Sequence, residues 1–173
     1  MKKIYSLSLL VFFVSCQEIK PRQSINKKEV RNLSSSAKRN KNLFTQEELL
    51  INSAAKKDSS YIYKKAPSGY LFAYVNKSSD YFKSPQKGEL VSFEYSIETL
   101  QKELLYNKKE LGIVYYRIDQ EDLLPALREG LRIMKVNEVV VFLFPSYLCY
   151  GYQGDGNKIG INQPLRFTIE RLN

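Results

Sequence analysis

The residues best suited to chemistry in this sequence gather in one segment, PSYLCYGYQGDGNKIG, which runs from Pro145 to Gly160. It holds three of the 13 tyrosines, four of the eight glycines and the thiol of Cys149. A thiol nucleophile needs a base nearby, and the sequence contains no histidine. We therefore expect Cys149 to be a small core residue. The glycines could also cradle a phosphate, but the segment opens no clear helix and lacks the GK[ST] motif.

The composition excludes two common enzyme classes and one class of partner. Without histidine, Ser-His-Asp hydrolases and histidine-ligated zinc enzymes are excluded. The 173 residues suffice for one domain with an appendage, and its core should be rich in tyrosine and phenylalanine. Much of the net charge of +9 lies between Lys20 and Lys41, where eight basic residues accompany a single acid, Glu29. Because this charge sits in a polar leader, we expect no nucleic acid partner.

The N-terminus predicts an export signal. Residues 1–15, MKKIYSLSLLVFFVS, combine two lysines with an apolar stretch too short to span a bilayer comfortably. Val14, Ser15 and Cys16 resemble the bacterial lipoprotein cleavage box, so we expect Cys16 to carry acyl chains that enter the lipid bilayer. The alternative is an ordinary secretory peptide whose cysteine is incidental. Gln17, in place of an aspartate, favours the outer membrane, which predicts a lipoprotein of the cell envelope that faces the periplasm.

A tether and a flanking helix are expected to follow. Residues 16–43 are rich in Lys, Asn, Ser and Gln without sustained periodicity, which predicts a flexible basic tether. It is either a plain solvated linker or a segment drawn to anionic lipid head groups. In residues 44–66, a flanking helix and linker, Thr45 and Glu48 fit a capping box that starts a short helix from about Gln46 to Lys56. This helix could pack on the domain or pair with a second copy of the chain.

The strand and helix patterns of residues 67–173 predict a single domain of the α+β class. Apolar and polar side chains alternate in LVSFEYSI (90–97) and PLRFTIERL (164–172), as in half-buried antiparallel strands. Three segments are apolar on both faces and should be more deeply buried: YLFAYVN (70–76), GIVYYRI (112–118) and EVVVFLF (138–144). One helical stripe interrupts them, with Pro125 in its first turn, and it is formed by Leu123, Leu127, Leu131 and Met134. The expected fold is an antiparallel sheet bent around one short helix.

These elements follow one another in a recognisable order. The segment FEY, the helix DLLPALREGL, the strand EVVVFLFP, the turn SYLCYG and the closing GNKIGINQPLRFTIERL occur in sequence. Over about Pro67 to Leu172, this order resembles the FKBP family of peptidyl-prolyl isomerases, and the last part, from Pro145, aligns to the family pattern without a gap. The lipoprotein signal, the basic tether and ELGIVYYRIDQEDLLPALREGL are similar to a narrower branch, the gliding-motility-associated lipoprotein isomerases of Bacteroidota. The resemblance implies an FKBP-like fold.

The resemblance also implies a binding site for a proline-containing polypeptide. Tyr150 matches the family tyrosine whose hydroxyl donates a hydrogen bond to a ligand carbonyl, and Ile159 matches the aliphatic residue of the glycine-rich flap. The implied catalytic residues are Tyr150, Tyr95, Leu127 and Phe167. The implied substrate-binding residues are Tyr106, Val114, Tyr116, Leu123, Leu124 and Ile159. Because any sheet packed on a helix would bury several of these side chains, Tyr150 and Ile159, which lie in loops, are the most informative.

The implied reaction needs no cofactor, metal, acid or base. Rotation about a prolyl bond faces a barrier of about 18–20 kcal/mol because the twisted amide loses its resonance, and no covalent bond breaks. An apolar slot that grips the proline ring and suits the twisted amide can lower this barrier. Two departures from the family pattern weaken the expected activity. Leu127 replaces the tryptophan common at the pocket floor, and the family's Phe-Asp pair has no carboxylate counterpart within Leu105, Tyr106 and Asn107.

Two functions fit these residues. The first is a membrane-anchored peptidyl-prolyl isomerase that assists the folding of exported proteins, with gliding motility as the setting implied by the branch. The second is a non-catalytic chaperone or assembly module of the motility or secretion machinery that uses the same pocket. The expected partners are proline-containing exported polypeptides, motility or secretion proteins, and the bilayer through the acyl chains on Cys16.

Overall fold

The computed structural model describes residues 27–78 and 83–173, with side chains described from residue 35 onward. The expected signal peptide, residues 1–15, and the expected lipid attachment site at Cys16 lie outside these ranges. Lys38–Asn173 forms one compact unit, and the contacts discussed below belong to it. In the part of the chain that is described, no helix is both long and apolar enough to cross a membrane.

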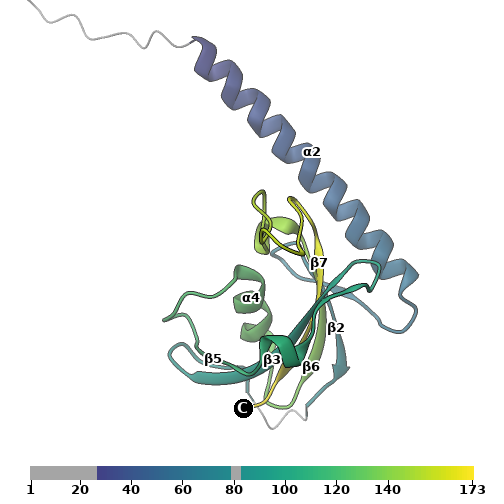
Figure 1. The fold of residues 1–173 in the computed structure, drawn as a ribbon, viewed down its shortest axis with the longest axis vertical. Helices are drawn as coiled ribbons and strands as arrows, with labels where there is room; N and C mark the ends of the chain where they lie inside the picture. Colours follow the sequence, from purple (N-terminus) through teal and green to yellow (C-terminus); the bar gives the residue numbers. More distant parts are fainter. Residues whose placement is uncertain (1–26, 79–82) are drawn as a thin grey trace, which may run out of the picture. The chain divides into compact units, whose positions relative to one another are not determined.

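An antiparallel sheet forms the body of this unit (Figure 1). Among the described residues it has seven strands in the order β1-β2-β6-β7-β3-β4, and β5 pairs with β3. All five predicted strands are present, which confirms the α+β class, whereas β1 and β4 are too short to show a periodic pattern. The bounds are Lys64–Lys65 (β1), Leu71–Asn76 (β2), Leu90–Thr99 (β3), Leu104–Tyr106 (β4), Val114–Arg117 (β5), Val139–Phe144 (β6) and Leu165–Arg171 (β7).

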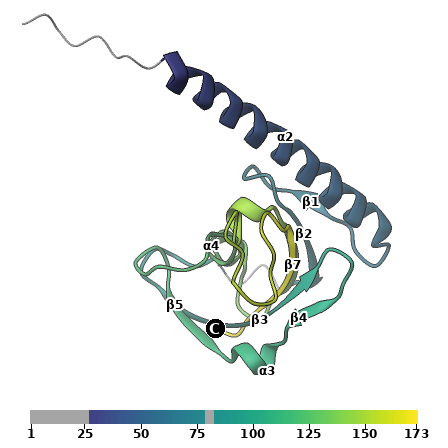
Figure 2. The same ribbon diagram turned by 45° about the horizontal axis from the view of Figure 1, so that its top comes forward.

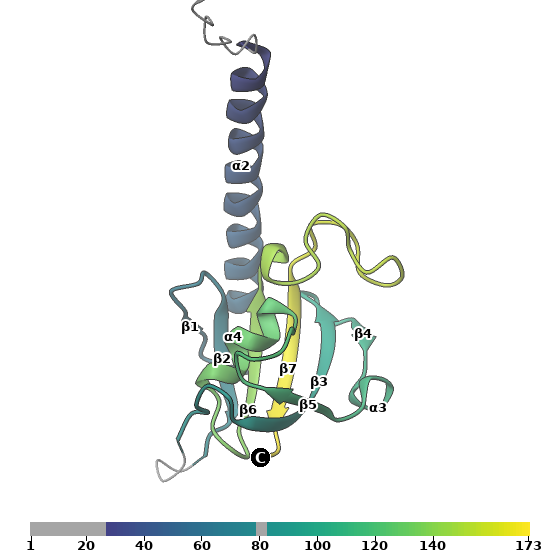
Figure 3. The same ribbon diagram turned by 90° about the vertical axis from the view of Figure 1, so that its left-hand side faces the viewer.

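Helix α4, Pro125–Ile133, packs on one face of the sheet (Figures 1 and 3). Its proline occupies the first turn, where a missing N–H leaves no helical hydrogen bond unmade. The predicted apolar stripe is buried at Leu127, Leu131 and Met134, whereas Leu123 precedes the helix. This confirms a sheet bent around one short helix. Two smaller elements complete this part, the single turn α3, Lys108–Leu111, and the 3-10 turn η1, Ser146–Leu148.

Strand β6 is buried on both faces, as predicted from its apolar sequence. Phe142 and Phe144 belong to the main core between the sheet and α4. Leu143, between them, packs in a second cluster with Leu71 and with Ile51 of helix α2, Lys27–Lys57. The alternation of a strand sends successive side chains to opposite faces, so α2 and α4 cover opposite sides of β6.

Strand β5 is less buried than predicted. Only Tyr116 of its four residues is buried, and Tyr115 is 66% exposed. Its ladder to β3 is its sole strand pairing within the described residues. The apolar run therefore belongs to an edge strand, and the prediction of deep burial for 112–118 was wrong.

Helix α2 is much longer than predicted. It begins at Lys27 and not at Gln46, so residues 27–43 of the expected tether are helical. Thr45 does not cap a helix start, since its hydroxyl donates to the Lys41 carbonyl oxygen at 3.0 Å within the helix. The segment contains neither glycine nor proline, and lysine, arginine and alanine are good helix formers, so nothing local ends the helix. Periodicity could not reveal it because its first turns lack an apolar stripe.

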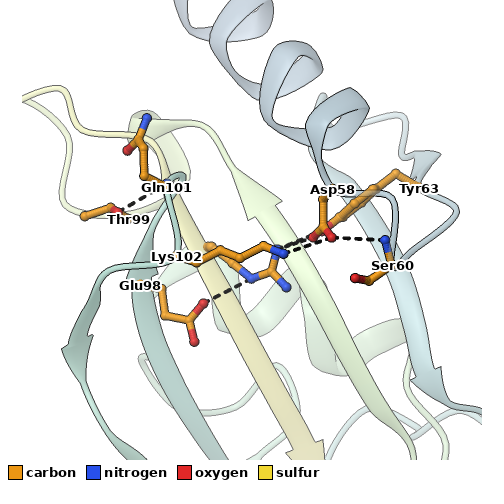
Figure 4. A network of polar contacts seen from close by, with 8 residues as sticks. Asp58, Ser60, Tyr63, Glu98, Thr99, Gln101 and Lys102 are labelled. Carbon is orange, nitrogen blue, oxygen red and sulfur yellow. Dashed lines mark hydrogen bonds and ion pairs between the residues drawn. The ribbon is translucent and has the colours of Figure 1, made fainter.

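A buried polar network joins the end of α2 to the sheet (Figure 4). Asp58, the residue after the helix, lies 2.7 Å from the Arg166 guanidinium on β7, and both side chains are almost fully buried. The Asp58 carboxylate also accepts hydrogen bonds from the Tyr63 hydroxyl at 3.0 Å and the Lys102 ammonium at 3.0 Å. Arg166 lies 3.1 Å from Glu98 as well. These contacts fix the second half of α2 against the domain.

Candidate functional site

The ten candidate side chains come from separate elements but belong to one apolar cluster. Four are buried in it: Tyr116, Leu127, Ile159 and Phe167. The other six are half-buried and pack against it: Tyr95, Tyr106, Val114, Leu123, Leu124 and Tyr150. A ligand could contact the six half-buried side chains, whereas the four buried side chains support them from within the core.

Tyr95 and Phe167 form a stacked aromatic pair on neighbouring strands. Their ring centroids are 6.1 Å apart and their planes differ by 7°. In the β3–β7 ladder Phe167 pairs with Ile97, which makes Tyr95 and Phe167 diagonal neighbours on the same face. Phe144 meets Phe167 edge-on at 5.6 Å. Burial raises the pKa of Tyr95, so this wall of the cluster is apolar and uncharged.

Tyr150 packs against this apolar cluster and carries a polar hydroxyl. Its hydroxyl has no hydrogen-bond partner among the described residues. Burial first, and the neighbouring Tyr95 next, raise the pKa of Tyr150 to about 12, so the group is protonated at neutral pH. A half-buried donor that has no partner in the described part of the chain is available to a ligand carbonyl.

The turn after β6 determines where Tyr150 lies. Chain direction reverses through η1, after which the Gly151 N–H donates to the Ser146 carbonyl at 2.9 Å. Gly151 has a φ of 56°, a left-handed conformation that glycine adopts without strain. Figure 3 shows the long connection from β6 to β7, in yellow-green, at one end of the sheet, and Figure 2 turns that end toward the viewer.

Residues 154–160 of this connection form the flap predicted to carry Ile159. Gly154 has a φ of 67°, and a Cβ there would lie 2.4 Å from the Ile159 carbonyl oxygen. The Asp155 carboxylate accepts the N–H groups of Asn157 and Ile159, both at 2.8 Å. The Asp155 side chain and the close approach of Gly154 to the Ile159 carbonyl therefore hold the flap in shape. The Ile159 side chain is buried in the cluster.

Asp155 is the site residue that sequence reasoning missed. The Tyr106 hydroxyl donates to its other carboxylate oxygen, and the Lys158 ammonium lies 4.4 Å from the centre of the Tyr106 ring. Burial opposes ionisation of Asp155, but the hydrogen bonds from Tyr106 and from the flap backbone outweigh it and lower its pKa. Residues 105–107 contain no carboxylate, and the carboxylate that Tyr106 contacts comes from the flap, 49 positions later in the sequence. The Asp-Gly pair at 155–156 was the available signal, as a turn marker.

The remaining candidates lie around the entrance to α4. Leu127 is 2% exposed and belongs to the main core, and its role as the pocket floor stays a prediction. Leu123 and Leu124 precede the helix and pack against the same cluster. Tyr116 is 2% exposed and its oxygen accepts the Asp119 N–H at 3.1 Å, so a ligand could reach little of it.

Cys149 is buried, and burial raises the pKa of its thiol, which confirms the core role expected of it. In the residues that the structure describes, no three Cys, Asp or Glu side chains converge as metal ligands. The cluster offers a ligand apolar contact and the neutral hydroxyl of Tyr150.

Two solved structures of bacterial proteins share this fold. FkpA from Escherichia coli has a TM-score of 0.60 and 19% identity, covering 88% of this chain and 74% of that one. A peptidyl-prolyl cis-trans isomerase from Pseudomonas syringae has a TM-score of 0.60 and 18% identity, covering 77% of this chain and 93% of that one. At such identities the likeness establishes the FKBP-like fold.

Sequence comparison goes further than the fold. A probable FKBP-type peptidyl-prolyl cis-trans isomerase, FkpA of Neisseria meningitidis, is 32% identical over 89 residues, which are 51% of this chain. The match spans about a third of that relative's length, 32%. The family model for FKBP-type peptidyl-prolyl cis-trans isomerases matches residues 82–172, more than half of the 173 residues. This chain therefore belongs to the FKBP-type peptidyl-prolyl cis-trans isomerase family.

Proposed function

We propose that this protein catalyses the cis/trans isomerisation of prolyl peptide bonds in polypeptides. The observation that carries the proposal is the hydroxyl of Tyr150, which is protonated, half-buried and without a partner among the described residues. The Tyr150 side chain packs against an apolar cluster that includes the stacked Tyr95 and Phe167 and the flap residue Ile159. Membership of the isomerase family supports the same assignment.

The proposed mechanism uses apolar contact and one hydrogen bond. The cluster takes up the proline ring, while the Tyr150 hydroxyl donates to a carbonyl oxygen of the bound polypeptide. Removal of water from the amide favours its twisted form, which has less charge separation than the planar form. Since such a mechanism depends on shape, the shorter Leu127 floor lowers the rate without abolishing it.

Leu127 also favours a second candidate function. A floor without tryptophan offers less flat surface to a proline ring, so the site could hold polypeptides without accelerating rotation. The protein would then be a non-catalytic chaperone or assembly module. The same apolar cluster serves both functions, and the rate of exchange distinguishes them.

The cellular setting is also a proposal. The lipoprotein-like N-terminus, with Cys16 as the acylated residue, supports a membrane-anchored protein of the cell envelope that faces the periplasm, and Gln17 favours the outer membrane. Exported proline-containing polypeptides would then be its substrates. Resemblance to the motility-associated branch supports gliding or secretion proteins among its partners.

Exchange spectroscopy tests the proposed activity. The cis and trans signals of a short X-Pro peptide are followed by NMR with and without the complete chain. We expect wild-type protein to accelerate exchange, and Leu127→Trp to accelerate it further while thermal unfolding shows that the variant is folded. Peptide binding without any acceleration, even at high protein concentration, would overturn the enzyme and favour the binding module.

A further inference from the structure

Helix α2 places a buried carboxylate against the turn that carries Tyr150. Glu47 is 2% exposed, and both of its carboxylate oxygens are used by one residue, Ser146. The Ser146 N–H donates to one oxygen at 2.8 Å and its hydroxyl donates to the other at 2.6 Å. Burial of a carboxylate is unfavourable unless such charge-assisted hydrogen bonds compensate for lost water. A buried glutamate that bonds twice to one serine therefore fixes that serine closely.

Ser146 passes this constraint to the backbone around Tyr150. Its carbonyl oxygen accepts the N–H groups of Cys149 and Gly151, both at 2.9 Å, and these residues flank Tyr150 on either side. The Gly151 carbonyl in turn accepts the N–H of Asn162 at 2.7 Å, just beyond the flap. A continuous series of hydrogen bonds thus runs from Glu47 to both ends of the flap.

Other contacts of α2 surround the same turn. Phe44 meets the Tyr147 ring edge-on at 5.2 Å, and the Tyr147 hydroxyl donates to the Ser68 carbonyl at 2.7 Å. A groove of about 440 Å³ lies between α2 and this turn, with Leu43 on one wall and Tyr150 on the other. The helix therefore borders the groove that Tyr150 lines.

We propose that Glu47 is a positioning residue for Tyr150, which makes helix α2 a working part of the isomerase site. This inference rests on the proposed function. The family match covers residues 82–172, so Glu47 lies outside it. Glu47 could instead serve only to hold α2 against the domain. In that case any other substitution that weakens the packing of α2 by the same amount should lower catalysis by the same factor.

Two matched pairs of variants of the complete chain separate these roles. Glu47→Gln and Ser146→Ala each remove part of the Glu47–Ser146 contact. Glu48→Gln changes the adjacent glutamate, whose partner is the exposed Lys65. Ile51→Val weakens α2 docking on the opposite side of the sheet from α4 and leaves both groups of the Glu47–Ser146 contact in place. Urea unfolding ranks the stability of all variants, and NMR exchange with an X-Pro peptide gives kcat and KM.

We expect Glu47→Gln and Ser146→Ala each to lower kcat/KM about tenfold, mainly through kcat, and the double variant to lose little more. Glu48→Gln and Ile51→Val should change kcat/KM by less than about twofold. If Ile51→Val, at equal loss of stability, slows catalysis as much as Glu47→Gln does, the positioning role is contradicted. Additive losses in the double variant would contradict it as well.

Amide hydrogen exchange tests the inference independently of turnover. Glu47→Gln should speed exchange of the Gly151 and Asn162 amides while those of the β3–β7 ladder keep their protection. Should wild-type protein prove inactive, the proposed enzyme fails and these two amides still decide the positioning role. Unchanged protection of Gly151 and Asn162 in Glu47→Gln would overturn it.

Discussion

The hydroxyl of Tyr106 donates a hydrogen bond to the carboxylate of Asp155, and this contact ties the short strand β4 to the flap. The same carboxylate holds the flap backbone through the N–H groups of Asn157 and Ile159. One side chain thus links the edge of the sheet to the residue expected to cover a bound proline. Flap position and sheet geometry are coupled through it.

Removal of the Tyr106 hydroxyl should loosen the flap more than the fold. We expect Tyr106→Phe to lower kcat/KM on an X-Pro peptide about threefold, because Asp155 still holds the flap backbone but loses its anchor on β4. Tyr115→Phe is the matched control, since Tyr115 lies 66% exposed on the edge strand β5. Equal activity of the two variants in the exchange assay would show that the Tyr106–Asp155 contact does not serve the site.

Loss of the Asp58 charge should destabilise the whole domain. Asp58→Asn leaves the buried Arg166 guanidinium without its closest carboxylate, although Glu98 remains 3.1 Å away. We expect the free energy of unfolding in urea to fall by about 3 kcal/mol. Asp119→Asn breaks a partly exposed ion pair with Arg132 and should cost less than about 1 kcal/mol. Similar losses in both variants would contradict the importance given to burial.

The same network predicts how stability depends on pH. Burial alone would raise the pKa of Asp58, but the hydrogen bonds from Arg166, Lys102 and Tyr63 outweigh it and hold the pKa well below its ordinary value. A carboxyl whose pKa is lowered by folding stabilises the protein fully above the unfolded pKa of about 3.9, and this stabilisation is lost as the pH falls. The difference in unfolding free energy between wild type and Asp58→Asn should therefore begin to shrink below about pH 5 and keep shrinking down to the lowest pH at which the domain stays folded. A difference that grows toward acid would refute this assignment.

Two flap glycines should respond differently to alanine. A Cβ at Gly154 would lie 2.4 Å from the Ile159 carbonyl oxygen, whereas one at Gly156 meets nothing within 4 Å. Both have positive φ, so Gly156→Ala should cost about 1 kcal/mol in unfolding free energy from backbone strain alone. Gly154→Ala should cost more and should also slow the isomerase, because the flap must move. If Gly154→Ala and Gly156→Ala lowered the unfolding free energy by the same amount and slowed turnover equally, the close packing of Gly154 would be contradicted.

Much of the fold was predictable from side-chain periodicity. The apolar residues alternate in the strands at 90–97 and 164–172, and Leu127 and Leu131 of α4 lie one turn apart and are buried. The burial of Ser92 and Arg166 on the polar faces of these strands did not follow from the pattern. Burial of β5 was mispredicted because an apolar run does not reveal whether a strand lies at an edge. The start of α2 was missed because no apolar stripe marks its first turns.

The candidate site was predictable as a set of residues but not as a network. Resemblance to a family supplied the aromatic and aliphatic positions, and they do lie in one cluster. The contacts of Asp155 and Glu47 join residues 49 and 99 positions apart in sequence. Polar residues in a loop and in a helix ordinarily face solvent, and the Asp-Gly pair at 155–156 marks only a turn, so the sequence did not reveal either partner.

The central claim is that the Tyr150 hydroxyl acts on the bound polypeptide, and one comparison tests it most directly. Cis/trans exchange of an X-Pro peptide is measured by NMR with the wild-type chain, with Tyr150→Phe and with Tyr152→Phe, whose side chain is 76% exposed two residues away. We predict that wild type and Tyr152→Phe accelerate exchange alike, and that Tyr150→Phe is about tenfold slower, as expected for the loss of one hydrogen bond in an apolar site. Equal acceleration by wild type and a folded Tyr150→Phe would contradict the account.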